Sequence, residues 1–283
     1  MPFSITHLKH RKIIHLKGPD KRSFLQGLIT QDVNDITSKK AIYAALLNPQ
    51  GRFLYDLLIS EDEEGEWLID CEHPEELIKR LMLFKLRSHI ELTYRKDWKV
   101  YALWNKGQID LPPQFMGGNS FVDPRTSQLG YRWYSSEAFA DHNLLPLESY
   151  DKHRILLGIP DGGRDIPLQK GIILEYNFNE LNGVSWKKGC YIGQELIART
   201  HHVGAVRKRL LPIIIEGLKP EIDTFFYDEN DQEIGLMRTS VNQYGLALLR
   251  LDMIKEKNLI PLNNGQTAIK PLIPEWFNLS NKK

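Results

Sequence analysis

The most informative segment of the chain reads Lys187-Lys188-Gly189-Cys190-Tyr191-Ile192-Gly193-Gln194-Glu195. It sets one thiol between two glycines and beside two lysines, just ahead of the helix-compatible run Gln194 to Thr200. Nearby ammonium groups and a helix N-terminus both favour the thiolate over the thiol, and flanking glycines let another molecule approach the sulfur. An intracellular cysteine is more often a small core residue, but these neighbours favour a functional role for Cys190.

The chain has only two cysteines, Cys71 and Cys190, in 283 residues. This number excludes a disulfide scaffold, a zinc finger and a self-contained four-cysteine cluster. Cys71 ends a β-like apolar run and is predicted to be a core residue. An iron–sulfur cluster at Cys190 would therefore need ligands from a partner protein, a second copy or a small thiol.

Two other functions of Cys190 remain open. A hydrolase nucleophile needs a base, and His201, His202 and Glu195 supply suitable residue types. Spacing along the chain does not establish their geometry, and the local signatures of cysteine proteases are absent. A zinc site is less favoured, because one cysteine with a His-His pair lacks the spacing of structural zinc ligands.

The composition is that of an ordinary globular protein of about two domains. Apolar residues make up 42% and charged residues 26%, and the formal net charge is +1. We therefore expect no membrane partner and no direct nucleic-acid partner. The basic residues Arg199 and 207–209 alternate with apolar ones, which favours a solvated face or an anion pocket.

The N-terminus shows no signal core and no Arg/Ser-rich presequence. The longest aliphatic run, Leu210 to Ile215, is broken by Pro212 and is far below the roughly 20 residues of a bilayer span. Few cysteines suit a reducing compartment. These observations predict a cytoplasmic protein, with a mitochondrial matrix location only if a presequence has been removed.

Hydrophobic patterning predicts alternating helices and strands followed by a β-rich end. Residues 41–47 and 52–59 are β-prone and are joined by Asn48-Pro49-Gln50-Gly51, a strong hairpin signal. Pro74 begins a predicted helix with apolar residues Leu77, Leu81, Phe84 and Leu86 near helical spacing.

From Val206 onward the pattern is strand and turn, which is typical of a small closed barrel. We place the domain boundary near Ala205. This gives an α+β region with two subdomains at 1–205 and a β-barrel at 206–283.

The segment from Trp186 to Arg199 resembles the signature of the YgfZ proteins, K-G-C-[YF]-x-G-Q-E. These proteins belong to the superfamily of the glycine-cleavage T-protein, or GcvT, an aminomethyltransferase. The extension from Ala198 to Gly204 with 207–210 resembles the branch of mitochondria and related bacteria, which acts late in [4Fe–4S] cluster maturation. Further matching pieces are Phe24 to Thr30 with Asp32-Val33, Gly51-Arg52 with Tyr55-Asp56, Asp123 to Thr126 with Leu129-Gly130, Gly158 to Pro160, Pro167-Leu168 and Asn182 to Ser185.

The resemblance implies a cloverleaf-like α+β body around a central channel that holds tetrahydrofolate or another reduced folate, followed by a small β-barrel. Asp56 falls where T-proteins have an acidic pair with one catalytic member, but Tyr55 occupies the other position. Glu175 falls near the carboxylate that binds the pterin, and a carboxylate suits an aminopyrimidinone edge. Arg52 and Lys188 are candidates for contacts with the folate's glutamyl carboxylates.

Three functions follow from these features. The leading one is a folate-binding iron–sulfur assembly factor, with Cys190 contacting a transient cluster shared with an A-type carrier or scaffold. Any link to tRNA modification would then be indirect, through [4Fe–4S] enzymes that thiolate tRNA. The second is a tetrahydrofolate-dependent aminomethyltransferase that uses Asp56, and the third is a direct RNA-binding protein, which salt-sensitive tRNA binding would reveal.

Overall fold

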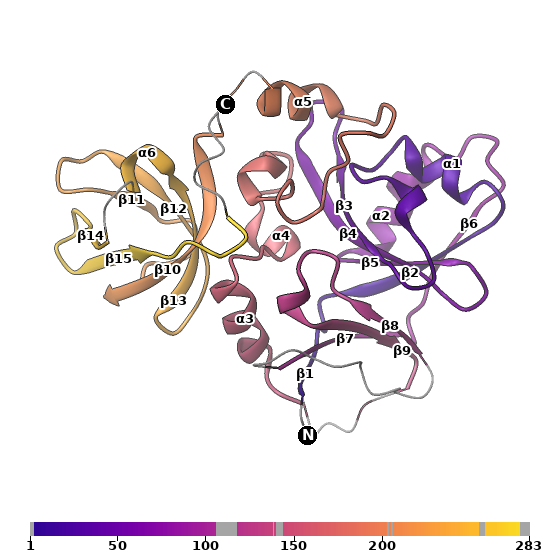
Figure 1. Cartoon of the computed structure of the whole chain (residues 1–283), viewed down its shortest axis with the longest axis horizontal. Helices are drawn as coiled ribbons and strands as arrows, with labels where there is room; N and C mark the ends of the chain where they lie inside the picture. The colour runs from indigo at the N-terminus through magenta and orange to yellow at the C-terminus, as the bar shows by residue number, and fades with distance from the viewer. Residues whose placement is uncertain are drawn as a thin grey trace.

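Three antiparallel β-sheets and short helices form the molecule, with the third sheet on one side and the other two on the opposite side (Figure 1). Helices α3 (Leu147–Leu156) and α4 (Gly162–Asp165) lie between the two sides (Figure 1). The computed structural model describes residues 3–105, 118–137, 139, 144–202, 204, 206–254 and 258–277. The predicted α+β class is confirmed.

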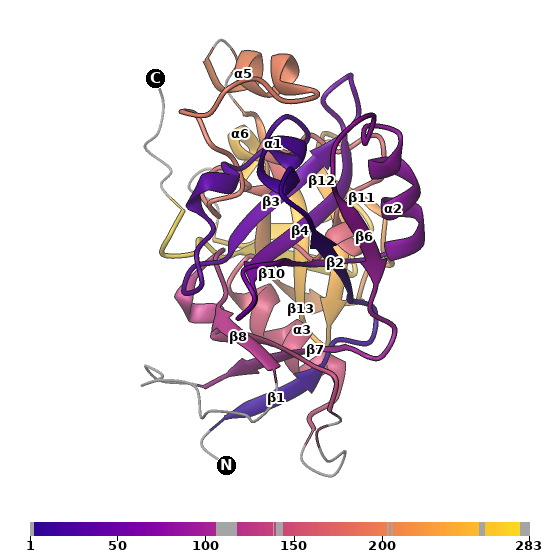
Figure 2. The ribbon, with the colours of Figure 1, turned by 90° about the vertical axis from the view of Figure 1, so that its right-hand side faces the viewer.

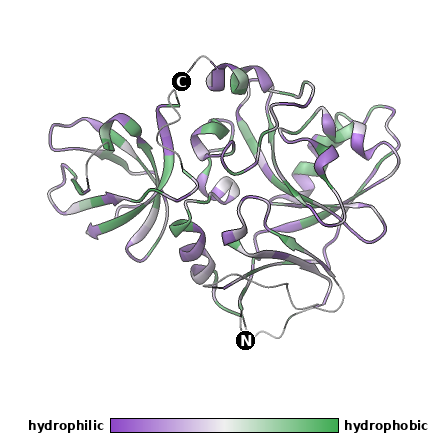
Figure 3. Ribbon diagram, viewed as in Figure 1, coloured by the Kyte–Doolittle hydropathy of each residue, from purple (hydrophilic) through white to green (hydrophobic). Residues whose placement is uncertain are grey.

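The first sheet has the order β3-β4-β5-β2-β6. Its strands are β2 (Lys12–Lys17), β3 (Ile42–Leu47), β4 (Phe53–Glu61), β5 (Trp67–Cys71) and β6 (Glu91–Tyr94). Strands β3 and β4 form the hairpin predicted from Asn48 to Gly51, and all six residues of β3 are buried. Their hydrophobic colouring in Figure 3 matches this burial.

The second sheet has the order β1-β7-β9-β8 and includes the N-terminal strand. Its strands are β1 (Ser4–His7), β7 (Lys99–Trp104), β8 (Gly118–Val122) and β9 (Tyr131–Ser135). In Figure 2 this sheet lies below the first sheet, so that the chain between β1 and β2 joins the two.

The third sheet has the order β11-β12-β13-β10-β15-β14. Its strands are β10 (Lys208–Gly217), β11 (Phe225–Tyr227), β12 (Glu233–Val241), β13 (Tyr244–Arg250), β14 (Ile260–Pro261) and β15 (Thr267–Pro271). The sheet curls so that the Asn263 amide, beyond β14, donates to the Tyr227 carbonyl at the end of β11, at 3.0 Å. The predicted boundary residue 205 lies outside the described residues.

Short helices cover the sheets. Besides α3 and α4, they are α1 (Lys21–Gln26), α2 (Pro74–Met82), α5 (Gln194–His202), α6 (Leu251–Ile254) and the 3-10 turns η1 (Val33–Asp35), η2 (Ser127–Leu129) and η4 (Ile173–Tyr176).

The sequence-based extension of α2 through Phe84 and Leu86 is wrong. The helix ends at Met82 and is followed by turns, and the side chains of Phe84 and Leu86 are 38% and 90% exposed. Leu86 has a left-handed backbone with φ of 42°, which no helix residue adopts. Apolar residues at helical spacing therefore continued past the end of the helix.

We call the first two sheets and the helices and turns around them, residues 3–202, the body. One hydrophobic core joins the body to the third sheet. It includes Leu210, Leu246 and Leu248 of that sheet together with Tyr43 and Phe178 of the body. Because side chains from both parts fill the same interior, the body and the third sheet pack as one folded unit.

Candidate functional site

The signature loop, residues 185–193, lies against the first sheet and leads into α5. The Ile192 amide donates to the Gly27 carbonyl at 3.1 Å. Gly193 has φ of +79°, and a Cβ there would lie 2.6 Å from the Asn48 carbonyl oxygen. This close approach to the β3–β4 turn requires glycine, so the second glycine of the motif fixes the loop on the hairpin.

Cys190 lies in this loop with its side chain exposed, four residues before α5 begins at Gln194. A Cβ added at the neighbouring Gly189 would meet no atom within 4 Å. The backbone beside the thiol is therefore open, which suits approach by a second molecule.

Lys188 anchors the signature loop instead of standing free beside the thiol. Its ammonium group donates to the carbonyls of Ile29 and Gln31, both at 2.8 Å. Burial lowers the pKa of Lys188 to about 8, and Asp32 opposes the shift. With two of its three protons used by backbone carbonyls, Lys188 is better suited to holding the loop than to the predicted contact with folate.

An aromatic cluster at the far end of α5 escaped the sequence analysis. Trp186 stacks on His201 with ring centroids 3.9 Å apart, and His202 lies edge-on at 5.9 Å. Burial, then the neighbouring His202, lowers the pKa of His201, so its imidazole is neutral near neutral pH. Trp186 lies four residues before Cys190 in the signature. This position does not predict that its ring stacks on His201 of α5.

Asp56 lies on β4 with 2% of its side chain exposed. The Arg11 guanidinium donates through Nη1 to Asp56 Oδ1 at 2.7 Å and through Nε to Asp70 Oδ1 at 2.5 Å. Burial disfavours the charge on Arg11, but Asp56 and Asp70 raise its pKa well above the usual value. The predicted site residue is therefore held in a buried ion-pair network.

Arg11 also escaped the sequence analysis, because it looks like part of the solvated basic run 9–12. Its partners Asp56 and Asp70 are 45 and 59 residues away along the chain. Only the pairing of strands brings them together.

Among the buried side-chain atoms of this region that have no protein hydrogen-bond partner are two oxygens. They are Asp56 Oδ2 and the Tyr43 hydroxyl oxygen. Tyr43 stacks on Phe178 with ring centroids 4.6 Å apart and faces the Arg125 guanidinium at 5.5 Å. Because buried polar groups are nearly always paired, these two atoms leave hydrogen-bonding capacity in the interior that the described side chains do not use.

Glu72 borders this network through the backbone of α4. Its Oε2 accepts from the Gly163 amide at 3.0 Å. Burial raises the pKa of Glu72; Arg11 opposes the shift and Asp56 adds to it. Gly162 packs tightly here, since a Cβ would lie 2.8 Å from Asp56 Oδ1.

Glu175 and Arg52 form a separate group next to β10. Glu175 is half-buried in η4, and burial raises its pKa while Lys208, Arg52 and Arg209 oppose the shift. The Arg52 guanidinium donates to the Lys170 carbonyl at 2.9 Å. Of the four predicted folate contacts, the structure thus places Arg52 and Glu175 within electrostatic reach of each other.

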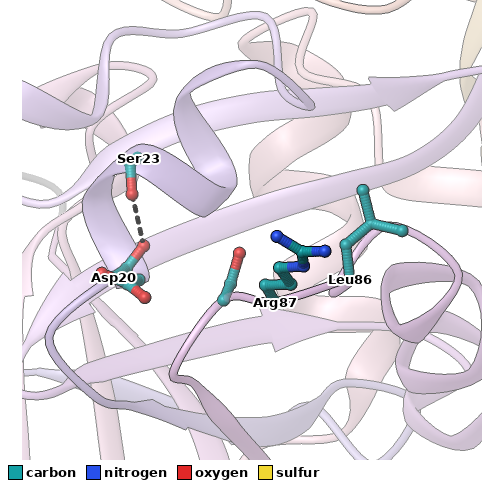
Figure 4. A pocket seen from close by; sticks show the side chains of 5 residues that line it. Asp20, Ser23, Leu86 and Arg87 are labelled. Carbon is teal, nitrogen blue, oxygen red and sulfur yellow. Dashed lines mark hydrogen bonds between the residues drawn. The ribbon is translucent and has the colours of Figure 1, made fainter.

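A surface hollow lies elsewhere, between the start of α1 and the turns after α2 (Figure 4). Asp20 and Ser23 stand on one side and Leu86 and Arg87 on the other, and the Ser23 hydroxyl donates to the Asp20 carbonyl at 3.0 Å. None of the predicted site residues lines it. The hollow is therefore separate from the candidate site, which consists of the exposed Cys190 loop and the buried polar residues around Asp56.

Comparison with known proteins decides the family. The iron–sulfur cluster assembly factor IBA57, mitochondrial, of Homo sapiens is 32% identical over 97% of this chain and 85% of its own length. This chain belongs to the IBA57 family. The mouse protein of the same name is 33% identical over 97% of this chain and 86% of its own length, and the homologue from Pyricularia oryzae is 31% identical over 90% and 73%.

Two further comparisons concern the C-terminal domain and the fold. Residues 207–279 match the family model described as the CAF17 C-terminal beta-barrel domain. The crystal structure of the glycine cleavage system aminomethyltransferase T from Bartonella henselae superposes with a TM-score of 0.71 over 97% of this chain and 86% of that chain, at 13% identity. The YgfZ/GcvT resemblance and the predicted fold, with its C-terminal barrel domain, are thus confirmed.

The prediction of a cytoplasmic protein is wrong by the same comparison, because the IBA57 relatives are named as mitochondrial. The low number of cysteines indicates only that the fold does not depend on disulfides. That property does not distinguish one reducing compartment from another.

Two features are absent from the described residues. None of the helices there is long and apolar enough to cross a membrane. Within the same residues, no group of three or more His, Cys, Asp or Glu side chains is arranged to hold a metal ion.

Proposed function

We propose that this protein is a folate-binding iron–sulfur cluster assembly factor that supports the maturation of [4Fe–4S] enzymes. Cys190 supplies one thiolate ligand to a cluster shared with a partner protein. The observation that carries this proposal is the exposed thiol of Cys190, presented on a loop that is fixed to the body on both sides.

The remaining cluster ligands come from the partner. A cluster normally takes about four protein ligands, and Cys71, the other cysteine, is fully buried, with burial raising the pKa of its thiol. The part of the chain that the structure describes holds no ready-made metal site. An A-type carrier or scaffold with its own cysteines is the partner that fits, and Cys190 binds as the thiolate after losing its proton.

The surroundings of Cys190 support an encounter with such a carrier. Lys187, three residues before the thiol in the same loop, is exposed, and Arg199 is exposed on the following helix α5. A thiolate-ligated cluster is an anion. Positive charge beside the docking point raises the rate of encounter with an anionic group.

The folate part of the proposal rests on the buried polar atoms of the body. Asp56 Oδ2 and the Tyr43 hydroxyl lack protein partners, and these groups are suited to the ring N–H groups and carbonyl of a pterin. Glu175 and Arg52 are the second pair of contacts that we propose. When bound, a reduced folate supplies a redox-active or one-carbon-carrying ring, while the chain's own residues hold its polar edge.

Aminomethyl transfer is the alternative function, favoured by a buried acid on the fold of an aminomethyltransferase. We rank it second, because Asp56 Oδ1 is engaged by Arg11. Incubation with tetrahydrofolate and an aminomethylated carrier separates the two, since methylene-folate formation would depend on Asp56 and not on Cys190.

The test in cells replaces Cys190 by Ser and assays a [4Fe–4S] enzyme where the native copy is absent. We expect enzyme activity to fall as far as in cells without the protein. Cys71→Ala is the matched control, which removes the other sulfur and is expected to rescue. Full rescue by Cys190→Ser would overturn the thiolate role.

A further inference from the structure

Four apolar side chains are exposed at the end of α2 and directly after it, within a run of five residues. Leu83 is 74% and Leu86 is 90% exposed, and Met82 and Phe84 are 44% and 38% exposed. We call these four residues the apolar tip. Single exposed apolar residues need no explanation, but a contiguous group marks an interaction surface.

The backbone of the apolar tip is held in place by hydrogen bonds. The amides of Leu83, Phe84 and Ser88 donate to carbonyls three residues earlier, at 3.2, 3.0 and 2.8 Å. Leu86 nevertheless has φ of 42°, a left-handed conformation that disfavours a side chain such as leucine. The fold gains neither burial nor a relaxed backbone from this leucine, which points to a role outside the fold.

The charged residues nearest the apolar tip along the chain are basic, while the acidic Asp20 lies across the hollow from Leu86. Residues 77–90 contain four Lys and Arg and no Asp or Glu, although the whole chain has a net charge of only +1. Lys79 and Arg87 are exposed on either side of the tip. Leu218, which follows β10, differs in that its neighbours have mixed charge: Lys219 is next to it, and Glu216 and Glu221 are two and three residues away.

An exposed apolar group with basic flanks fits a lipid surface better than a protein pocket. Its most exposed residue, Leu86, lines the hollow opposite the acidic Asp20 and the polar Ser23, so the hollow offers no apolar pocket (Figure 4). Protein interfaces instead bury their anchor residues in fitted pockets. Leucine and phenylalanine beside lysine and arginine are the pattern of interfacial membrane binding.

We propose that the apolar tip and its basic flanks dock this protein on an anionic phospholipid surface. Leu83 and Leu86 enter the boundary between headgroups and acyl chains, while Lys79 and Arg87 lie at the lipid phosphates. This surface is independent of the proposed cluster chemistry. The expectation of no membrane partner rested on the net charge of the whole chain and on the lack of a spanning segment. Neither property reveals a small local binding site.

Flotation of the full chain with vesicles tests the proposal. Vesicles of phosphatidylcholine containing about 30% phosphatidylglycerol are compared with pure phosphatidylcholine. We expect flotation with the anionic vesicles only, weakened by added salt. Leu86→Asn should lower the bound fraction about tenfold, while its thermal unfolding temperature stays equal or rises because asparagine accepts the left-handed backbone.

Leu218→Asn is the matched control, because Leu218 is an exposed leucine just after β10 and far from α2 in the sequence, and this variant should float like wild type. The proposal is overturned if wild-type protein does not bind anionic vesicles, or if Leu86→Asn binds them as wild type does. An equal loss of vesicle binding in Leu218→Asn would also overturn it, because binding would then not depend on the position of the exposed leucine. If the Leu86 variant loses a protein partner and vesicles never bind, the tip is a protein interface.

Discussion

At the scale of single residues, the buried Arg11 links two strands of the first sheet through its ion pairs. It is 1% exposed and pairs with Asp56 and Asp70, which are 2% and 0% exposed. Removing one member of a buried charge network leaves the others unpaired, and this costs far more than losing a surface ion pair.

We therefore expect Arg11→Met to lower the free energy of unfolding by about 3–5 kcal/mol, since buried Asp56 loses its guanidinium partner and Asp70 is left with Arg132 and the Tyr134 hydroxyl. Urea denaturation followed by circular dichroism measures this change. Arg250→Met is the control, because Arg250 pairs with Asp252 at the surface, and it should leave the unfolding midpoint unchanged. A loss below about 1 kcal/mol for Arg11→Met would contradict the ion-pair account.

Glu72 predicts a pH dependence, because burial raises its pKa; Arg11 opposes this and Asp56 adds to it. A carboxyl with a higher pKa in the folded state stabilises the fold fully below its unfolded pKa, and this stabilisation is lost as pH rises through the folded pKa. Glu72→Gln keeps an acceptor for the Gly163 amide, so we expect a higher Tm near pH 7 and little change near pH 4. Thermal melts across pH measure it, with the exposed Glu63→Gln as control. A lower Tm near pH 7 would contradict it.

At the scale of elements, the signature loop is fixed by its second glycine and open at its first. Gly193 has φ of +79° and touches the β3–β4 turn, whereas a Cβ at Gly189 would meet nothing. The two glycines that flank Cys190 therefore have different structural roles. The sequence alone does not distinguish them.

We expect Gly193→Ala to destabilise the protein by more than about 1 kcal/mol, because alanine suits neither the backbone nor the space. Gly189→Ala, in the same loop, should be close to neutral. Chemical denaturation measures both, and the rate of Cys190 alkylation reports whether the loop moves. Equal effects of the two substitutions would contradict the assigned roles.

How far the sequence predicts these elements depends on how local their causes are. The hairpin at Asn48 to Gly51 was predictable, since turn residues and β-prone flanks act over a few positions. The end of α2 was not, because Phe84 and Leu86 continue the helical spacing while the chain turns at Leu86. The Arg11 network was beyond reach, because its partners lie 45 and 59 residues away.

At the scale of the whole molecule, the body and the third sheet share one core and buried polar contacts. The fully buried Asn177, next to η4, donates through Nδ2 to the Leu210 carbonyl at 2.7 Å. Because the two parts interlock in this way, we expect one cooperative unfolding transition and not two.

Asn177→Ala tests this interlock, since it removes a buried hydrogen bond and places alanine at φ of 66°. We expect a loss of about 1–3 kcal/mol with unfolding still in one step, measured by calorimetry. Asn182→Ala has a similar left-handed backbone, at φ of 58°, but an exposed side chain, so it should cost less. Two separate transitions in the wild-type protein would contradict a shared core.

The central claim is that Cys190 ligates a cluster shared with a partner. Native mass spectrometry of this protein mixed with a cluster-loaded A-type carrier tests it most directly. We predict a complex of one copy of each protein with one cluster for the wild type and for Cys71→Ala, and none with a cluster for Cys190→Ser. A cluster-containing complex formed by Cys190→Ser in the same yield as by the wild type would contradict the claim.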